Sequence, residues 1–129
     1  MLAEYLHRSA RYSALQYETF PSCEKFFLWV SQLRKRGVVR VALFDPAGKM
    51  VTSEEFAGVI DQAGVAGVQQ LVMAVGPADG WSREDRKAAQ QIISFGRITL
   101  PHELALAVAA EQIYRALTIL AGHPYHSGH

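Results

Sequence analysis

Residues 38–44 read Val-Val-Arg-Val-Ala-Leu-Phe, an almost continuous apolar run rich in β-branched side chains. Such a run is typical of a strand that is covered on both faces, as the strands of parallel sheets are. Before it, apolar residues at helical spacing follow Pro21-Ser22 and end at Gly37, which indicates a helix with a glycine stop. A turn at residues 45–48 comes after it. The stretch therefore predicts, in an α/β domain, a strand that is covered on both faces.

Helices and strands are expected to alternate on both sides of this strand. Thr52 and Glu55 form a capping pattern at the start of a helix, and Ser82 and Asp85 repeat it. The pattern predicts a parallel sheet with right-handed crossovers, whose ligands lie beyond the carboxyl ends of the strands. The other expected elements are a helix over about 2–11, strands at 13–19, 68–75 and 95–100, a helix from Ser82 to about Ile93, and a last helix from Pro101 to Gly122.

Length and composition favour a single domain over residues 1–129. Half of the residues are hydrophobic, which suffices for a core, and no repeat or Pro/Gly/Ser-rich linker marks a boundary. Charged residues make up 19% of the chain, and the last helix is apolar all round from Leu104 to Ala110. We therefore expect this surface to be buried in a homodimer. The net charge of +1 means that any nucleic-acid binding relies on a local patch.

The expected compartment is the cytoplasm. The lone Cys23 cannot form an internal disulfide and suits a reducing environment. Residues 1–8 lack a charged segment followed by an apolar one, and no window reaches the ~18 apolar residues that span a bilayer. We expect no membrane partner.

Three local features leave more than one interpretation open. Residues 76–80, Gly-Pro-Ala-Asp-Gly, form either a plain turn or a loop that a ligand approaches closely. Glu111 and Arg115 stand four residues apart on a helix, as an ordinary ion pair or a functional one. The tail 123–129 holds three of the five histidines, but solvated imidazoles are more common in such tails than a metal site, and we expect no metal. The usual dinucleotide and P-loop glycine motifs are absent.

Three blocks of sequence, in order, resemble a known family. The first is Phe44-Asp45-Pro46-Ala47-Gly48-Lys49 with Thr52-Ser53-Glu54-Glu55-Phe56-Ala57, and the second spans residues 76–82. The third combines Leu100-Pro101-His102, Glu111-Gln112-Ile113-Tyr114-Arg115-Ala116 and His123-Pro124-Tyr125-His126. With these blocks the chain resembles, over about residues 3–126, the SPOUT-class pseudouridine N3-methyltransferases of the bacterial large ribosomal subunit.

The resemblance implies a C-terminal trefoil knot, an obligate dimer and S-adenosylmethionine (AdoMet) as cofactor, with no metal. The substrate would be large-subunit ribosomal RNA or the assembled ribosome, methylated at N3 of a pseudouridine by in-line displacement from a sulfonium. By position, the implied catalytic residues are Tyr125, His126 and Arg115. The implied cofactor-binding residues are Phe44, Gly76, Pro77, Gly96, Arg97, Ile98, Thr99 and Leu100.

The chain also departs from the pattern of that family. The opening strand has no counterpart, so we expect a sheet that is one strand short, unless Met1 is not the native start. Pro77 replaces a glycine and removes an N–H donor, Leu106 replaces an arginine, and residues 127–129 lack a terminal base. These differences keep an alternative open, in which the chain is a catalytically impaired, knotted dimer that acts as a ribosome-binding or interaction module.

Overall fold

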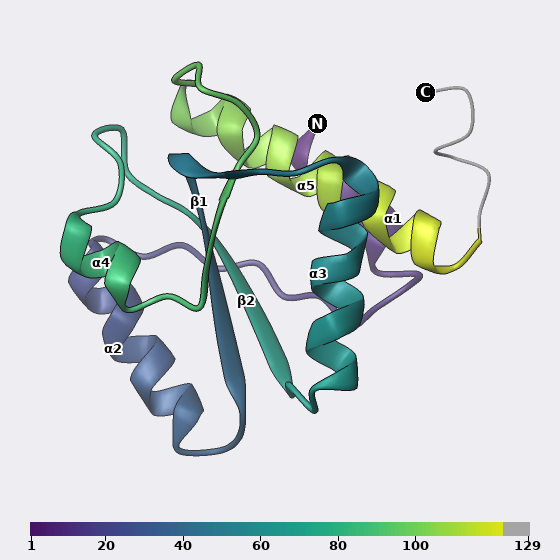
Figure 1. The fold of residues 1–129 in the computed structure, drawn as a ribbon, viewed down its shortest axis with the longest axis horizontal. Coiled ribbons are helices and arrows are strands. Elements are labelled where there is room, and N and C mark those ends of the chain that lie inside the picture. Colours follow the sequence, from purple (N-terminus) through teal and green to yellow (C-terminus); the bar gives the residue numbers. More distant parts are fainter. Residues whose placement is uncertain (123–129) are drawn as a thin grey trace.

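Three parallel strands form the centre of the protein, seen in a computed structural model that describes residues 1–122. Strand β1 (Val39–Met50) lies between β2 (Gln70–Val75) and β3 (Gln91–Ser94), and it is parallel to both. Figure 1 shows β1 and β2. Val41, Ala42 and Leu43 of β1 have no exposed surface. The predicted α/β class with a parallel sheet is therefore confirmed, and so is the strand in the 38–44 run that is covered on both faces.

Helices cover both faces of this sheet, because successive side chains of β1 point to opposite sides. On one face, Val41 and Leu43 pack against Phe26 and Val30 of helix α2 (Cys23–Arg34). On the other face, Ala42 belongs to a second core cluster formed with helices α3 (Ser53–Val65) and α5 (His102–Leu120). Figure 1 shows α2 on one side of the strands and α3 and α5 on the other. The alternating burial explains why the whole run is apolar.

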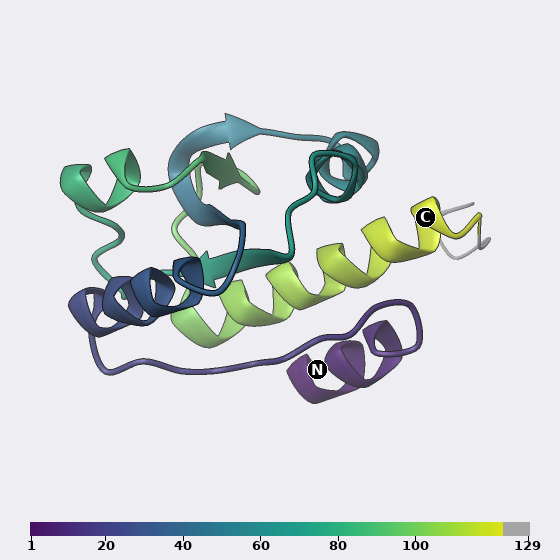
Figure 2. The same ribbon diagram turned by 90° about the horizontal axis from the view of Figure 1, so that it is seen from below.

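Helix α1 (Leu2–Ser9) packs against α5, as Figure 2 shows. The rings of Tyr5 and Tyr12 lie 6.0 and 6.1 Å from the ring of Tyr114. The predicted strand at residues 13–19 is wrong, because this segment pairs with no strand and all its residues are exposed. A period-two pattern indicates only that a segment would suit a sheet, and a strand also needs a partner for its backbone.

The segment between β2 and α5 differs most from the prediction. Helix α4 (Arg83–Lys87) ends well before Ile93, and the strand lies at residues 91–94, not at 95–100. The reason is pairing with β1. The Gln90 N–H donates to the Val41 carbonyl over 3.0 Å, and the Gln90 Oε1 accepts from the Val41 N–H over 2.7 Å. This pairing draws the chain out of the helix and into the sheet.

Two glycines shape the ends of the strands. Strand β1 continues to Met50 through an irregularity at residues 45–48, so that Phe44 and Lys49 both pair with Ile93. The predicted turn therefore lies inside a strand. Gly48 allows this close approach, since a Cβ there would lie 2.7 Å from the backbone of Ile92. Gly96, at φ +136°, then turns the chain out of β3.

The start of α3 predicts a measurable pH effect on stability. The Thr52 N–H donates to the Glu55 carboxylate over 2.8 Å, and this hydrogen bond lowers the pKa of Glu55 below its ordinary value of 4.5. The stabilisation from this carboxylate is thus present above pH 4.5 and lost as the pH falls through the lowered folded pKa. Urea denaturation of wild type and Glu55→Gln should show their stability difference shrinking on acidification, because glutamine keeps the acceptor but not the charge. Glu54→Gln is the control, and equal pH dependence of the two variants would contradict the assignment.

Candidate functional site

Hydrogen bonds at the carboxyl edge of the sheet join β1, the loop after β2 and the start of α5. The Trp81 indole Nε1 donates to the Phe44 carbonyl over 3.1 Å, which ties the loop after β2 to β1. The His102 Nδ1 lies 3.0 Å from the Gly76 carbonyl oxygen, which ties the same loop to the start of α5. Because a carbonyl only accepts, the imidazole donates here. The edge where the fold class predicts a ligand is therefore a connected unit.

Asp45, in the irregular part of β1, joins this strand to the loop after β2 and is only 8% exposed. Its carboxylate accepts from the Ala47 N–H over 2.8 Å and from the Trp81 N–H over 3.4 Å. The Arg86 Nη1 lies 4.0 Å from the same carboxylate and donates to the Trp81 carbonyl over 2.7 Å. The sequence predicts a turn at Asp45, and nothing in the spacing of Asp45 relates it to Trp81 or Arg86.

Gly76 is enclosed by protein, not by open space. A Cβ on Gly76 would lie 2.8 Å from the Trp81 Nε1 and 2.9 Å from its Cε2. The Trp81 indole therefore fills the space where a side chain at position 76 would stand, and cofactor binding at Gly76 stays a prediction. The positive φ in this loop belongs to Gly80, at +80°. Pro77 is exposed, and its carbonyl accepts from the Gly80 N–H over 2.8 Å.

The loop after β3 offers the groups that a nucleoside ligand needs. Arg97, Ile98 and Thr99 are exposed, Leu100 is half-buried, and the Ile98 side chain keeps 79% of its surface. An exposed loop with an uncovered apolar side chain suits a flat ring such as adenine. By contrast, the Phe44 ring packs against Phe95 at 4.8 Å and so forms part of the core beneath the loop.

A pocket of about 300 Å³ lies beside this loop. Its volume is at the lower end of small-molecule sites. Of the residues predicted to bind cofactor, Gly96 lines it, whereas Gly76 and Pro77 do not. The lining comes from β1, α3, β3 with its loop, and α5: Met50, Val51, Ser53, Ser94, Phe95, Gly96, Val108 and Gln112.

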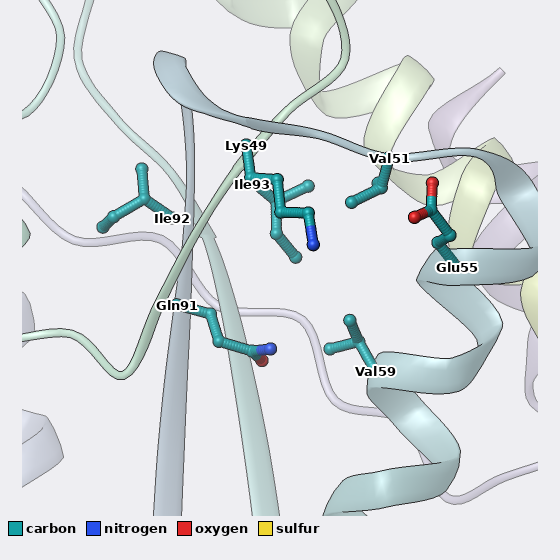
Figure 3. Close-up of a pocket in the computed structure, with 7 residues that line it drawn as sticks. All are labelled: Lys49, Val51, Glu55, Val59, Gln91, Ile92 and Ile93. Carbon is teal, nitrogen blue, oxygen red and sulfur yellow. The ribbon is translucent and has the colours of Figure 1, made fainter.

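A second pocket, of about 290 Å³, shares Val51 with the first and lies between the sheet and α3. Figure 3 shows the side chains of Lys49 and Gln91 extending toward α3, where Glu55 and Val59 lie. The Gln91 Oε1 is buried and has no hydrogen-bond partner among the described residues. This pocket was not found from the sequence, because Gln91 was expected inside a helix.

Arg115 belongs to a hydrogen-bonded network on α5 that reaches the first pocket. Its Nη2 lies 2.7 Å from the Glu111 carboxylate, so the i,i+4 ion pair is confirmed. The Gln112 Nε2 donates to the other oxygen of Glu111 over 2.6 Å, and the Ser53 Oγ donates to the Gln112 Oε1 over 3.1 Å. Tyr125 and His126, the other two predicted catalytic residues, lie outside the described residues.

Other kinds of chemistry find little support in residues 1–122. No group of three His, Cys, Asp or Glu side chains in this range could hold a metal ion. Burial, and next to it the Asp85 charge, raise the pKa of the Cys23 thiol, which disfavours a thiolate nucleophile. No helix in the same range has the length and apolarity to span a membrane.

Sequence comparison identifies the family. The family model described as "Predicted SPOUT methyltransferase" matches residues 1–126. The chain belongs to the SPOUT methyltransferase family. A relative from Koribacter versatilis, named ribosomal RNA large subunit methyltransferase H, is 45% identical over 129 residues, which are all of this chain and 88% of the relative. A relative of the same name from Deinococcus deserti is 37% identical over 95% of this chain and 85% of its own length.

A solved structure supports the SPOUT fold. The SpoU methyltransferase AviRb from Streptomyces viridochromogenes, crystallised in complex with AdoMet, superposes with a TM-score of 0.50. The match covers 81% of this chain and 37% of AviRb at 16% sequence identity, so it shows a shared fold. The trefoil knot stays a prediction.

The packing of Gly76 against Trp81 predicts the cost of a side chain at this position. We expect Gly76→Ala to lower the free energy of unfolding by about 1–3 kcal/mol, as overpacking does, because the indole must move away from the Phe44 carbonyl. The matched control is Gly58→Ala in α3, where a Cβ meets nothing within 4 Å. It should stabilise the helix by about 0.5–1 kcal/mol. If urea denaturation gave the same change in stability for Gly76→Ala and Gly58→Ala, the Trp81 indole would move aside without a measurable cost.

Proposed function

We propose that the protein is an AdoMet-dependent methyltransferase that modifies large-subunit ribosomal RNA at N3 of a pseudouridine. The observation that supports it most is the 45% identity with a ribosomal RNA large subunit methyltransferase H over the whole length of this chain. The joined loops at the carboxyl edge of the sheet supply a site for the cofactor. Because its substrate is ribosomal, we place the protein in the cytoplasm.

The residues at this edge fit the cofactor. We assign adenosine binding to the main chain of residues 96–100, with the exposed Ile98 and half-buried Leu100 covering the ring. In this proposal Phe44 and Gly76 support the cofactor site through their contacts with Trp81 and His102, and Pro77 shapes the same loop through the hydrogen bond from the Gly80 N–H to its carbonyl. Bound AdoMet supplies a methyl group on a sulfonium centre.

The chain itself must align the base and assist the loss of the N3 proton. We assign this work to Tyr125 and His126, with Arg115 as electrostatic support. The ion pair with Glu111 and the neighbouring Gln112 fix the guanidinium on α5 beside the pocket that Gly96 lines. A fixed charge costs less reorganisation during reaction than a free one.

The proposal includes a homodimer. On α5, Leu104 and Leu120 keep 42% and 44% of their surface in the single chain, although Ala107, Ala109 and Ala110 are buried. These exposed leucines support burial against a second copy. In this assembly the C-terminal segment of each chain threads the predicted knot, and residues 1–129 act as one domain.

The alternative is a knotted, catalytically impaired dimer that binds the ribosome. Pro77, Leu106 and the tail 127–129 are the residues that motivate it. Cofactor affinity separates the two functions, because a methyltransferase must bind AdoMet and a docking module need not.

Calorimetric titration with AdoMet and methyl transfer test the proposal together. We expect saturable binding, and transfer of tritium from methyl-labelled AdoMet to large subunits or ribosomes that lack the modification. The methylated nucleoside should be identified by mass spectrometry. Binding without transfer to subunits or ribosomes would favour the docking module, and absence of both would reject the assigned cofactor.

Substitutions in the tail test the catalytic assignment. Tyr125→Phe and His126→Ala should lower the rate of methyl transfer, about 10²–10⁴-fold if the residue moves the proton, because general acid–base groups contribute on that scale. AdoMet affinity should stay within about twofold of wild type, since these residues are assigned to the base. His129→Ala, three residues further along the tail, is the matched control. Equal losses in the control, or a parallel loss of cofactor binding, would contradict the assignment.

A further inference from the structure

A cationic corner, formed by Arg34, Lys35 and Arg36, lies at the amino edge of the sheet and has no role in the site described above. Between Glu24 and Asp45 the sequence holds five Lys or Arg residues and no Asp or Glu. Three of them, Arg34, Lys35 and Arg36, are consecutive and exposed. Figure 1 shows the end of α2 and the start of β1 at one end of the sheet, with the start of α5 at the other.

The neighbours of these cations are neutral. Within residues 1–122, no carboxylate lies within 4.0 Å of their side chains. Arg34 donates to the Gln90 Oε1 over 3.2 Å. Beside them, the Gln69 side chain accepts from the Val38 N–H over 3.1 Å. The corner therefore combines uncompensated positive charge with neutral amides.

Helix structure explains only part of this charge. A cation in the last turn of a helix stabilises its carbonyl end, and Arg34 occupies that position. Lys35 is the C-cap residue and Arg36 lies beyond the helix, so neither belongs to the last turn that Arg34 already stabilises. With a net charge of only +1, the chain concentrates positive charge here and does not spread it evenly.

We infer that the corner of Arg34, Lys35 and Arg36 binds the phosphate backbone of a second segment of the RNA substrate. The inference rests on the proposed function, because it assumes that the partner is RNA. Six residues of β1, 39–44, separate the corner from the loops, which is about 20 Å at the rise of a strand. A single target nucleotide cannot reach both places. The corner would therefore position a large folded RNA without contacting the methylated base.

Paired charge removals test the inference. The test variant is Lys35→Gln with Arg36→Gln, which leaves Arg34 and its contact with Gln90 in place. The matched control is Lys25→Gln with Arg83→Gln, two exposed cations at the start of α2 and on α4. Both variants lose two charges, and thermal unfolding should show that both remain folded.

The first measurement needs no turnover. Affinity for protein-free large-subunit ribosomal RNA is measured over a series of salt concentrations, without cofactor. For the test variant, the slope of log affinity against log salt should flatten by about two, and affinity at low salt should fall roughly tenfold or more, since each lost phosphate contact contributes about one to the slope. The control should follow wild type. Equal changes in both variants, or an unchanged slope, would overturn the inference.

The second measurement uses methyl transfer to large subunits. KM for the subunit should rise in the test variant, while kcat and AdoMet affinity stay as in wild type. A fall in kcat at unchanged KM would overturn the inference. The inference would also be overturned if the test variant bound intact subunits more weakly than wild type but bound protein-free RNA equally well. That result would indicate a ribosomal protein as the partner. Absence of methyl transfer by the wild type would instead count against the proposed function. The salt series would still test whether the corner binds RNA phosphates.

Discussion

The pairing of β1 on both of its edges is the constraint on which the structure depends. A strand in the middle of a parallel sheet must be apolar on both faces, and helices must cover it. Parallel pairing also requires that each connection cross back over the sheet, which brings the carboxyl ends of all three strands to one edge. The Val-Val-Arg-Val-Ala-Leu-Phe run therefore sets the class of fold and the location of the functional loops.

At that edge, order comes from side chains that bind the backbone of other loops. Trp81 and Asp45 connect β1 to the loop after β2, and Arg86 contacts both residues. Their buried hydrogen bonds hold the segment before α4 in one arrangement. The more exposed loop after β3, residues 96–100, is the part that we propose binds the cofactor. A binding site is more precise when the residues that contact the ligand are supported by a hydrogen-bonded layer, as the segment around Trp81 can support the loop 96–100.

The sequence predicts those elements whose pattern is local, and it fails where pairing decides. The capping boxes at Thr52 and Ser82 both form as predicted, because each is closed within four residues. The strand at 91–94 depends on Gln90 meeting Val41, which lies 49 residues earlier, and no spacing rule contains that contact. Similarly, Gly76 could be recognised as special from its place after a strand. The reason why position 76 excludes a side chain is its contact with the Trp81 indole, and only the folded structure reveals this contact.

The contact between His102 and Gly76 has a consequence for which side chains can stand at the start of α5. A carbonyl oxygen can only accept, so the ring nitrogen facing it must hold a hydrogen. A side chain that can only accept, such as a carboxylate, would place two acceptors against each other with no hydrogen between them. Position 102 therefore requires a hydrogen-bond donor if the loop after β2 is to stay joined to helix α5.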